Sequence, residues 1–190
     1  MGSRTLQEAF VFDRIDFCVG GDIGKMASRA GQLGFRRIGT SFDNTLRENV
    51  VCRLAGIPSS PVKFPYVVVS DRINTSQPAN VVTLANFSQA KERLKKYCKK
   101  GTGLEFSMNR ARKMTGPDVA KWFVDIGQAS AFCESTGCQL ILSSGANAIS
   151  EMISGRCFDA ILKECGVDPD RHWQGMNIWL DTVLARRVTI

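Results

Sequence analysis

The sequence predicts an α/β fold in which helices pack outside a parallel sheet. Strand-like and helix-like segments alternate along the 190 residues, and this alternation favours parallel strands joined by outer helices. The hydrophobic fraction of 44% and the charged fraction of 23% are typical of a globular protein with a sizeable core. No internal repeat, low-complexity tract or interdomain linker interrupts the pattern. We therefore expect one domain over residues 1–190.

The first third of the chain predicts strand, helix, strand and helix in that order. Residues 12–19 alternate apolar and polar side chains, which is typical of a strand. Asp22 is placed to cap a helix, and Gly34 to end it in the left-handed conformation that a Cβ disfavours. The apolar side chains of this helix are Ile23, Met26, Ala27, Ala30 and Leu33. A strand at residues 35–39 follows, and then a second helix marked by Leu46, Val50, Val51 and Leu54 and closed by Gly56.

The rest of the chain continues the alternation. Further strands are predicted at residues 66–70, 80–84, 103–108 and 139–144. Further helices are predicted from a cap at Ser88, from Pro117 to Gly137, around residues 148–165, and over 169–187 with a cap at Asp168. The six predicted strands fit an open sheet or a closed barrel equally well. A full (β/α)₈ barrel takes about 250 residues, so a barrel of this length would be trimmed.

The composition excludes several classes of protein. No apolar run is long enough to span a bilayer and no signal segment opens the chain, so no membrane association is expected. Seven cysteines at scattered spacing predict free thiols in a reducing compartment, which is the cytoplasm, or the nucleus in a eukaryote. The single histidine, His172, and the absence of a C-x-x-C pair argue against a metal site. We expect neither a cofactor nor a metal ligand on this chain.

Positive charge is concentrated in residues 91–113. This segment holds nine basic and two acidic residues, and its net charge of +7 equals that of the whole chain. Such a concentration is typical of a surface that binds a polyanion such as RNA. A solvated helix face is the alternative, and the pairs Arg36-Arg37 and Arg186-Arg187 could extend either surface. The nine basic residues are Lys91, Arg93, Lys95, Lys96, Lys99, Lys100, Arg110, Arg112 and Lys113.

Catalytic machinery is sparse. Asp16 and Glu105 lie in the middle of predicted strands and are the candidate acid and base of an enzyme, although strand acids more often pair with a nearby Arg or Lys. A serine nucleophile needs a base, and His172, beside Trp173, is interpreted as a packing residue. The chain contains no GxGxxG, Walker or GxSxG motif. We therefore predict no catalytic residue.

Two stretches in the second half of the chain carry a resemblance to a known family. Leu104-Glu105-Phe106-Ser107 and Ser143-Ser144-Gly145-Ala146 stand in order with a long predicted helix between them. Arg156 and Asp159 follow at matching places, and residues 14–39 add a similar strand and helix. This order resembles ribonuclease P protein component 3, the TIM-barrel subunit of archaeal and eukaryal ribonuclease P. In pattern, the resemblance covers about two thirds of the chain.

The resemblance implies a trimmed TIM-barrel-like fold with helices outside and a noncatalytic, RNA-binding role. The catalytic RNA and its Mg²⁺ ions would remove the 5′ leader of precursor tRNA. The implied partners are the ribonuclease P RNA, precursor tRNA in the complex, and component 2, a small ferredoxin-like (RRM-like) subunit. Two pairs of the protein subunits would form a heterotetramer.

Other interpretations stay open at this stage. The turn at Ser143, Ser144 and Gly145 is either purely structural or a contact to an RNA phosphate or the partner subunit. We count Ser143, Ser144 and Arg156 with the nine basic residues as candidate RNA contacts. The first alternative function is a free-standing TIM-barrel-like enzyme acting on a small phosphorylated or sugar-like substrate through Asp16 and Glu105. The second is a scaffold for protein assembly with a merely solvated basic face.

Overall fold

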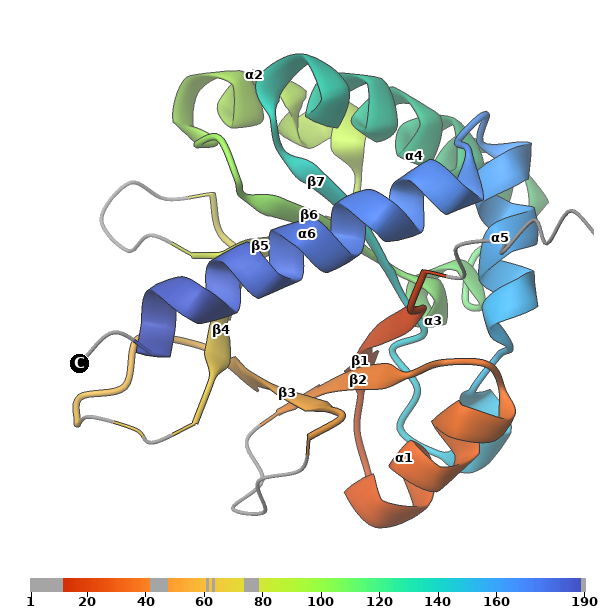
Figure 1. Cartoon of the computed structure of the whole chain (residues 1–190). Helices are drawn as coiled ribbons and strands as arrows, with labels where there is room; N and C mark the ends of the chain where they lie inside the picture. The colour runs from red at the N-terminus through yellow and green to blue at the C-terminus, as the bar shows by residue number, and fades with distance from the viewer. Residues whose placement is uncertain (1–11, 42–47, 61, 63, 74–78, 189–190) are drawn as a thin grey trace, which may run out of the picture.

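Seven parallel strands lie beside one another in chain order in the part of the chain that the structure describes (Figure 1). The structure is a computed structural model that describes residues 12–41, 48–60, 62, 64–73 and 79–188. The strands are β1 (Ile15–Val19), β2 (Arg37–Ser41), β3 (Val50–Leu54), β4 (Tyr66–Ser70), β5 (Val81–Thr83), β6 (Gly103–Ser107) and β7 (Gln139–Ser143). The helices are α1 (Ile23–Gln32), α2 (Phe87–Tyr97), α3 (Met108–Ala111), α4 (Gly116–Thr136), the 3₁₀ turn η1 (Ile149–Glu151), α5 (Gly155–Glu164) and α6 (Pro169–Val188).

The sheet is nearly closed into a barrel at the seam between β1 and the segment after β7. Val19 and Ala146 form a parallel bridge. The Gly20 N–H donates to the Ala146 carbonyl at 2.7 Å, and the Gly145 N–H donates to the Cys18 carbonyl at 2.9 Å. Helices lie between and outside the strands, which confirms the predicted TIM-barrel-like α/β fold. The barrel is trimmed because, among the described residues, no helix lies between β2 and β5.

The helix predicted through Val50, Val51 and Leu54 is wrong, because this segment is the strand β3. It pairs in parallel with β2, where Ile38 is opposite Val50, and with β4 on its other side. β3 begins with the run Val50-Val51-Cys52, which is apolar without alternation, and a segment of five residues with such a run cannot be distinguished from one face of a helix. Leu46, the first residue of the predicted helix, lies outside the described residues.

Most helix ends follow the local signals. The Asp22 carboxylate accepts the Lys25 N–H at the start of α1, and Asp168 accepts the Arg171 N–H at the start of α6. Gly34 and Gly137 adopt φ of 84° and 70° after α1 and α4. The predicted cap at Ser88 is wrong. The cap of α2 is Asn86, which accepts the Gln89 N–H at 2.9 Å.

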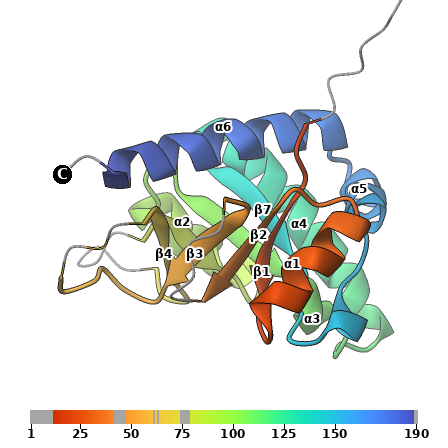
Figure 2. The same cartoon turned by 60° about the horizontal axis from the view of Figure 1, so that its bottom comes forward.

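The last helix closes one end of the barrel rather than joining the outer layer. α6 crosses the ends at which the strands begin (Figures 1 and 2). Trp179 packs edge-on against Phe17 of β1, and its indole N–H donates to the carbonyl of Gly101, just before β6, at 2.7 Å. Large apolar side chains of this kind each stabilise the fold by about 1.5–3 kcal/mol on burial. Neither α6 nor any other described helix is long and apolar enough to cross a membrane.

Candidate functional site

The basic segment 91–113 is divided between the two ends of the barrel. α2 precedes β6 and α3 follows it, so the end of α2 lies near the start of β6 and α3 lies at its other end. The five residues of β6 separate these places by roughly 15 Å. The lysine cluster is formed by Lys95, Lys96, Lys99 and Lys100. The arginine cluster is formed by Arg110, Arg112 and Lys113.

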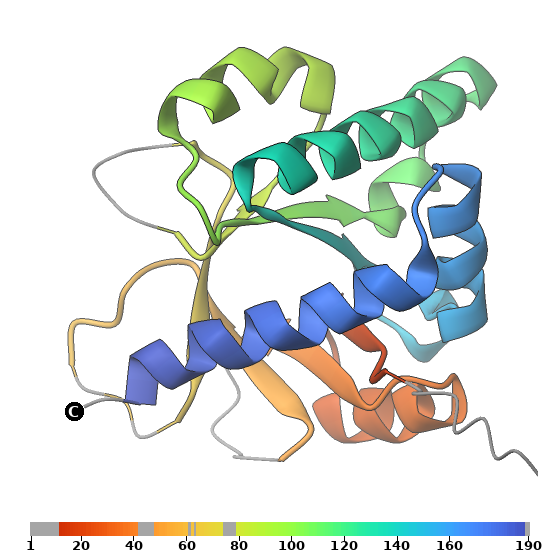
Figure 3. The ribbon, with the colours of Figure 1, turned by 45° about the horizontal axis from the view of Figure 1, so that its top comes forward.

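The lysine cluster is exposed and largely unpaired. All four side chains are exposed, at the end of α2 and in the turn after it. Among the described residues one ion pair reaches the cluster, between Lys95 and Glu92 at 2.7 Å. The Lys96 ammonium lies 5.1 Å from the centre of the Tyr97 ring. α2 packs beside α4 outside the sheet (Figure 3), with Leu94 buried and the lysines facing away from the core.

The arginine cluster is exposed at the end of the barrel where the strands finish. Arg112 donates to the carbonyl oxygen of Glu151. The pKa of Glu151 is lowered, first by the Asn147 N–H and in smaller part by the charges of Arg112 and Lys113. No ion pair involves this cluster within the residues that the structure describes. Its positive charge therefore faces solvent.

The remaining predicted basic contacts are scattered. Lys91 is half-buried on α2, and Arg93 is exposed and donates to the Ile73 carbonyl at 3.2 Å. Arg156 is exposed on α5, away from β6. Arg36 and Arg37 form ion pairs with Asp13 and Asp181, at 3.2 and 2.9 Å. The side chains of Arg186 and Arg187 lie outside the described residues.

Ser143 and Ser144 lie inside the barrel and not on a surface. Both are fully buried. The Ser144 hydroxyl accepts the Ala146 N–H at 3.1 Å and donates to the Cys18 carbonyl at 3.4 Å. These bonds fix the chain at Ser144, where the barrel closes. The Ser143 hydroxyl is buried without a hydrogen-bond partner among the described residues. The helix expected directly after this turn begins only at Gly155, after the short 3₁₀ turn η1.

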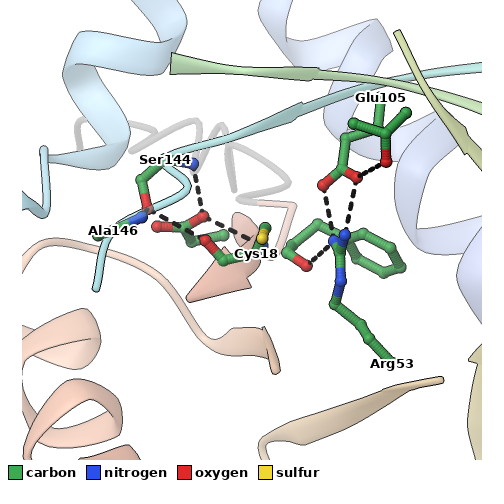
Figure 4. Close-up of polar contacts among 8 residues, drawn as sticks. Cys18, Arg53, Glu105, Ser144 and Ala146 are labelled. Atoms are coloured by element: carbon green, nitrogen blue, oxygen red, sulfur yellow. Dashed lines mark hydrogen bonds and ion pairs between the residues drawn. The ribbon is translucent and has the colours of Figure 1, made fainter. Parts of the chain in front are cut away.

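Glu105 is neutralised inside the barrel by a partner that the sequence did not identify. Arg53, on β3, donates to its two carboxylate oxygens at 2.6 and 2.8 Å, and the Thr83 hydroxyl donates to it at 3.0 Å. Arg53 also donates to the Phe17 carbonyl and lies over the Phe17 ring. The sequence analysis missed Arg53 as the partner of Glu105 because it predicted a helix for this segment. The helices were expected outside the sheet, so no side chain of this segment was expected in the barrel interior. Figure 4 shows Arg53 and Glu105 facing each other.

Asp16 accepts hydrogen bonds from the backbone N–H groups of Cys18 and Ser144, and the Ser144 hydroxyl accepts one from Ala146. Figure 4 shows Cys18, Ser144 and Ala146 together, apart from Arg53 and Glu105. One oxygen of Asp16, Oδ1, accepts the Ser144 N–H at 2.8 Å. The other, Oδ2, is buried without a partner among the described residues. Burial raises the pKa of Asp16 to about 6, while the hydrogen bonds from Ser144 oppose the shift. Asp16 can therefore hold or release a proton near neutral pH, but it has no direct contact with Glu105.

Other titratable groups are structural. Asp159 binds Arg14 through both oxygens and accepts the Trp173 indole N–H at 2.8 Å. These bonds tie α5 to α6 and to the residue just before β1. His172 is buried and packs edge-on against Trp173, and burial lowers its pKa to about 4. Within the described residues, no group of three or more His, Cys, Asp or Glu side chains could hold a metal ion.

Comparison with known proteins adds no family to this description. No protein-family model and no curated protein matches the sequence.

Proposed function

We propose that this chain is a noncatalytic, RNA-binding protein subunit of ribonuclease P. In this proposal it supports the catalytic RNA in removing the 5′ leader of precursor tRNA. The Mg²⁺ ions that the chemistry needs are bound by the RNA. The protein partner is component 2, the ferredoxin-like subunit, in a heterotetramer of two pairs. The trimmed TIM-like barrel and the sequence motifs that resemble component 3 support this identity.

The observation that carries the proposal is the exposed, unbalanced charge of the lysine and arginine clusters. Seven cationic side chains lie in these clusters, and the described ion pairs neutralise one of them. Each exposed lysine or arginine can replace a counterion on an RNA phosphate, and the release of that counterion favours binding. Because the clusters lie at opposite ends of β6, we propose that they contact two separate RNA segments or two strands of one folded RNA.

Binding of the catalytic RNA across a series of salt concentrations tests the proposal. Three variants are compared with wild type, each with its basic residues replaced by glutamine. The first removes the lysine cluster and the second removes the arginine cluster. The third is a matched control that removes four exposed charges elsewhere, at Lys25, Arg29, Lys163 and Arg171. An unrelated structured RNA serves as the competitor.

We expect a steep log–log salt dependence in wild type. Each lost phosphate contact lowers its slope by about 0.7–0.9, so the lysine variant loses up to about 3.6 and the arginine variant up to about 2.7. The control variant keeps the wild-type slope, and wild type prefers the ribonuclease P RNA over the competitor. Equal slopes in all four proteins, or no preference between the two RNAs, would contradict the proposal.

A second candidate is a TIM-barrel-like enzyme for a small phosphorylated or sugar-like substrate. The observation that favours it is Asp16, whose pKa lies near 6 and whose Oδ2 is unpartnered among the described residues. Its proposed partner, Glu105, has both oxygens engaged by Arg53, which leaves no free second carboxylate. Turnover of a small substrate that is lost in Asp16→Asn and kept in the lysine variant would favour this candidate.

A further inference from the structure

Two thiols from distant parts of the chain meet beside the lysine cluster. Cys98 ends α2, and Cys138 lies immediately before β7. Their sulfur atoms are 3.5 Å apart, although the residues are 40 positions apart in sequence. Both cysteines are free and half-buried. They form the one direct sulfur–sulfur contact between cysteines in the described part of the chain.

The backbone on both sides holds the two sulfurs in this position. The Cys98 N–H donates to the Leu94 carbonyl at the last turn of α2, at 2.8 Å. The Gly101 N–H donates to the Gly137 carbonyl at 2.8 Å, and the Gln139 N–H donates to the Thr102 carbonyl at 2.9 Å. These two bonds flank Cys138 and tie its segment to the turn that follows Cys98. The pair is therefore a feature of packed backbone and not of two flexible side chains.

The two sulfurs are chemically unequal. The hydrogen bond between the two thiols can run in either direction, and the Cys138 sulfur also lies 3.6 Å from the Lys99 carbonyl. With the Cys98 thiol as the donor, the pKa of Cys138 is lowered to about 7, and Thr136 and the Thr102 backbone support this shift against the effect of burial. The same hydrogen bond, with burial added, raises the pKa of Cys98. A thiolate is the nucleophilic form of cysteine. In that arrangement Cys138 is the attacking sulfur, and Cys98 is a protonated thiol in contact with it.

Small molecules can approach Cys138 from outside the barrel. It lines a groove of about 470 Å³ between α4, α6 and the turn before α6. Cys133 lines the same groove but is buried, and burial raises its pKa. Cys157 is exposed on α5, and its sulfur accepts a hydrogen bond from the Ser154 hydroxyl. Cys157 therefore provides an accessible thiol for comparison.

We propose that Cys98 and Cys138 are a redox-active dithiol that a hydroperoxide closes into an intramolecular disulfide. The Cys138 thiolate attacks one peroxide oxygen and the O–O bond breaks. The released hydroxide, or alkoxide, takes up a proton, and Cys138 becomes a sulfenic acid. The Cys98 sulfur then attacks Cys138, the S–O bond breaks, and hydroxide leaves as water with the Cys98 proton. For hydrogen peroxide, two thiols and one peroxide give one disulfide and two waters.

The bond would join the end of α2, next to Lys96 and Lys99, to the start of β7. It would close a loop of 40 residues between two packed elements. A cross-link over a loop of this length constrains the unfolded chain, and we expect the Tm of the oxidised protein to rise by roughly 5–15 °C. The proposal is independent of RNA binding, since it concerns only the state of the two sulfurs.

The first experiment maps the thiols of the wild-type full chain. The protein is treated with increasing hydrogen peroxide, alkylated, and digested with trypsin and a glutamyl endopeptidase. Cleavage after Glu134 places Cys133 and Cys138 in different peptides. We expect a linked peptide pair containing Cys98 and Cys138, a mass loss of two hydrogens, and reversal by dithiothreitol. Alkylation of both Cys98 and Cys138 at peroxide doses that already oxidise Cys157 would overturn the proposal.

Three single variants sharpen the result. In Cys98→Ser, Cys138 has no thiol to resolve its sulfenic acid, and we expect that acid to be trapped by dimedone. In Cys138→Ser the linked peptide disappears and Cys98 stays reduced. Cys157→Ser is the matched control and keeps both the linked peptide and the rise in Tm. A linked peptide that joins Cys138 to a different cysteine in wild type would overturn the proposal, whatever the variants do.

Discussion

Asp16 and Glu105 are two acidic residues in the middle of barrel strands, and their surroundings differ sharply. Both are buried, with exposed fractions of 0% and 1%. Glu105 has a bidentate partner in Arg53 and a further donor in Thr83. Asp16 has backbone donors on one oxygen, no described donor on the other, and a pKa of about 6. The contrast teaches that the role of a strand carboxylate is decided by the side chain opposite it across the barrel.

The largest expected effect comes from breaking the Glu105 cluster. Arg53→Ala leaves Glu105 buried without its cation and removes the guanidinium from the Phe17 ring. We expect the free energy of unfolding to fall by about 3–5 kcal/mol, measured by urea denaturation at pH 7. The reason is that the interior cannot hydrate an unpaired carboxylate as water does.

A double variant provides the control for this prediction. Arg53→Met combined with Glu105→Gln removes both charges and leaves chains of similar volume. We expect it to recover at least half of the stability that Arg53→Ala loses, because the buried unpaired charge is gone. A double variant that is less stable than Arg53→Ala would show that the packing of Arg53, and not its charge, stabilises the interior.

Neutralising Asp16 is expected to act in the opposite direction. In the folded chain Asp16 keeps its proton up to a pKa of about 6, against an ordinary value of 3.8. The unfolded chain therefore releases this proton first, and the wild-type stability contributed by Asp16 falls as pH rises from about 4 to 6. Asp16→Asn removes that fall and should stabilise the protein at pH 7 by about 1–3 kcal/mol.

Unfolding free energies of wild type and Asp16→Asn from pH 4 to pH 7 measure this difference. The difference should be near its minimum at pH 4, where the folded wild type carries a protonated Asp16. It should grow to its full value just above pH 6. A constant difference over the whole range would mean that Asp16 is already ionised in the fold and that the contrast with Glu105 is smaller than proposed.

A smaller effect is expected from the hydroxyl beside Asp16. Ser144→Ala removes the acceptor of the Ala146 N–H, which is buried at the seam of the barrel. An unsatisfied buried N–H costs about 1–3 kcal/mol, and we expect a loss in the lower half of that range by urea denaturation. Hydrogen exchange at the Ala146 amide should accelerate relative to that at Val67, on β4, three strands from β7 in the sheet order. Unchanged protection of Ala146 would contradict the assigned bond.

The smallest effect is expected on the Glu105 side. Thr83→Val is nearly isosteric and removes one donor from a carboxylate that keeps both bonds to Arg53. We expect a loss of about 1 kcal/mol or less, measured as a shift of the urea midpoint. A loss as large as that of Arg53→Ala would mean that Thr83, and not the guanidinium, is the main partner of Glu105.

Local signals in the sequence were sufficient for most of the fold. Asp22, Asp168, Gly34 and Gly137 stand where the structure ends or begins helices, because capping depends on residues within one turn. The segment containing Arg53 was not predicted correctly, since five apolar-rich residues satisfy the pattern of a helix face as well as that of a buried parallel strand. The error also hid Arg53 as the partner of Glu105.

The candidate RNA surface was predicted in part. The excess charge of residues 91–113 is a property of composition, and its exposure follows from the cost of burying lysine and arginine. Its division into two clusters depends on β6, which carries the chain from one end of the barrel to the other. Ser143 and Ser144 were predicted as contacts because a strand end often faces a ligand. At this strand end, closure of the barrel buries both hydroxyls.

The sequence by itself determined most of the strands and helices outside residues 46–56, most of the helix caps and the amount of positive charge, since each depends on residues that are near neighbours in the chain. Only the tertiary structure decided which groups meet. Arg53 and Glu105 are 52 positions apart, Cys98 and Cys138 are 40 apart, and Asp16 and Ser144 are 128 apart. Contacts over such separations are set by strand order, register and the closure of the barrel. These arise from the packing of the whole core and leave no signal in a local pattern.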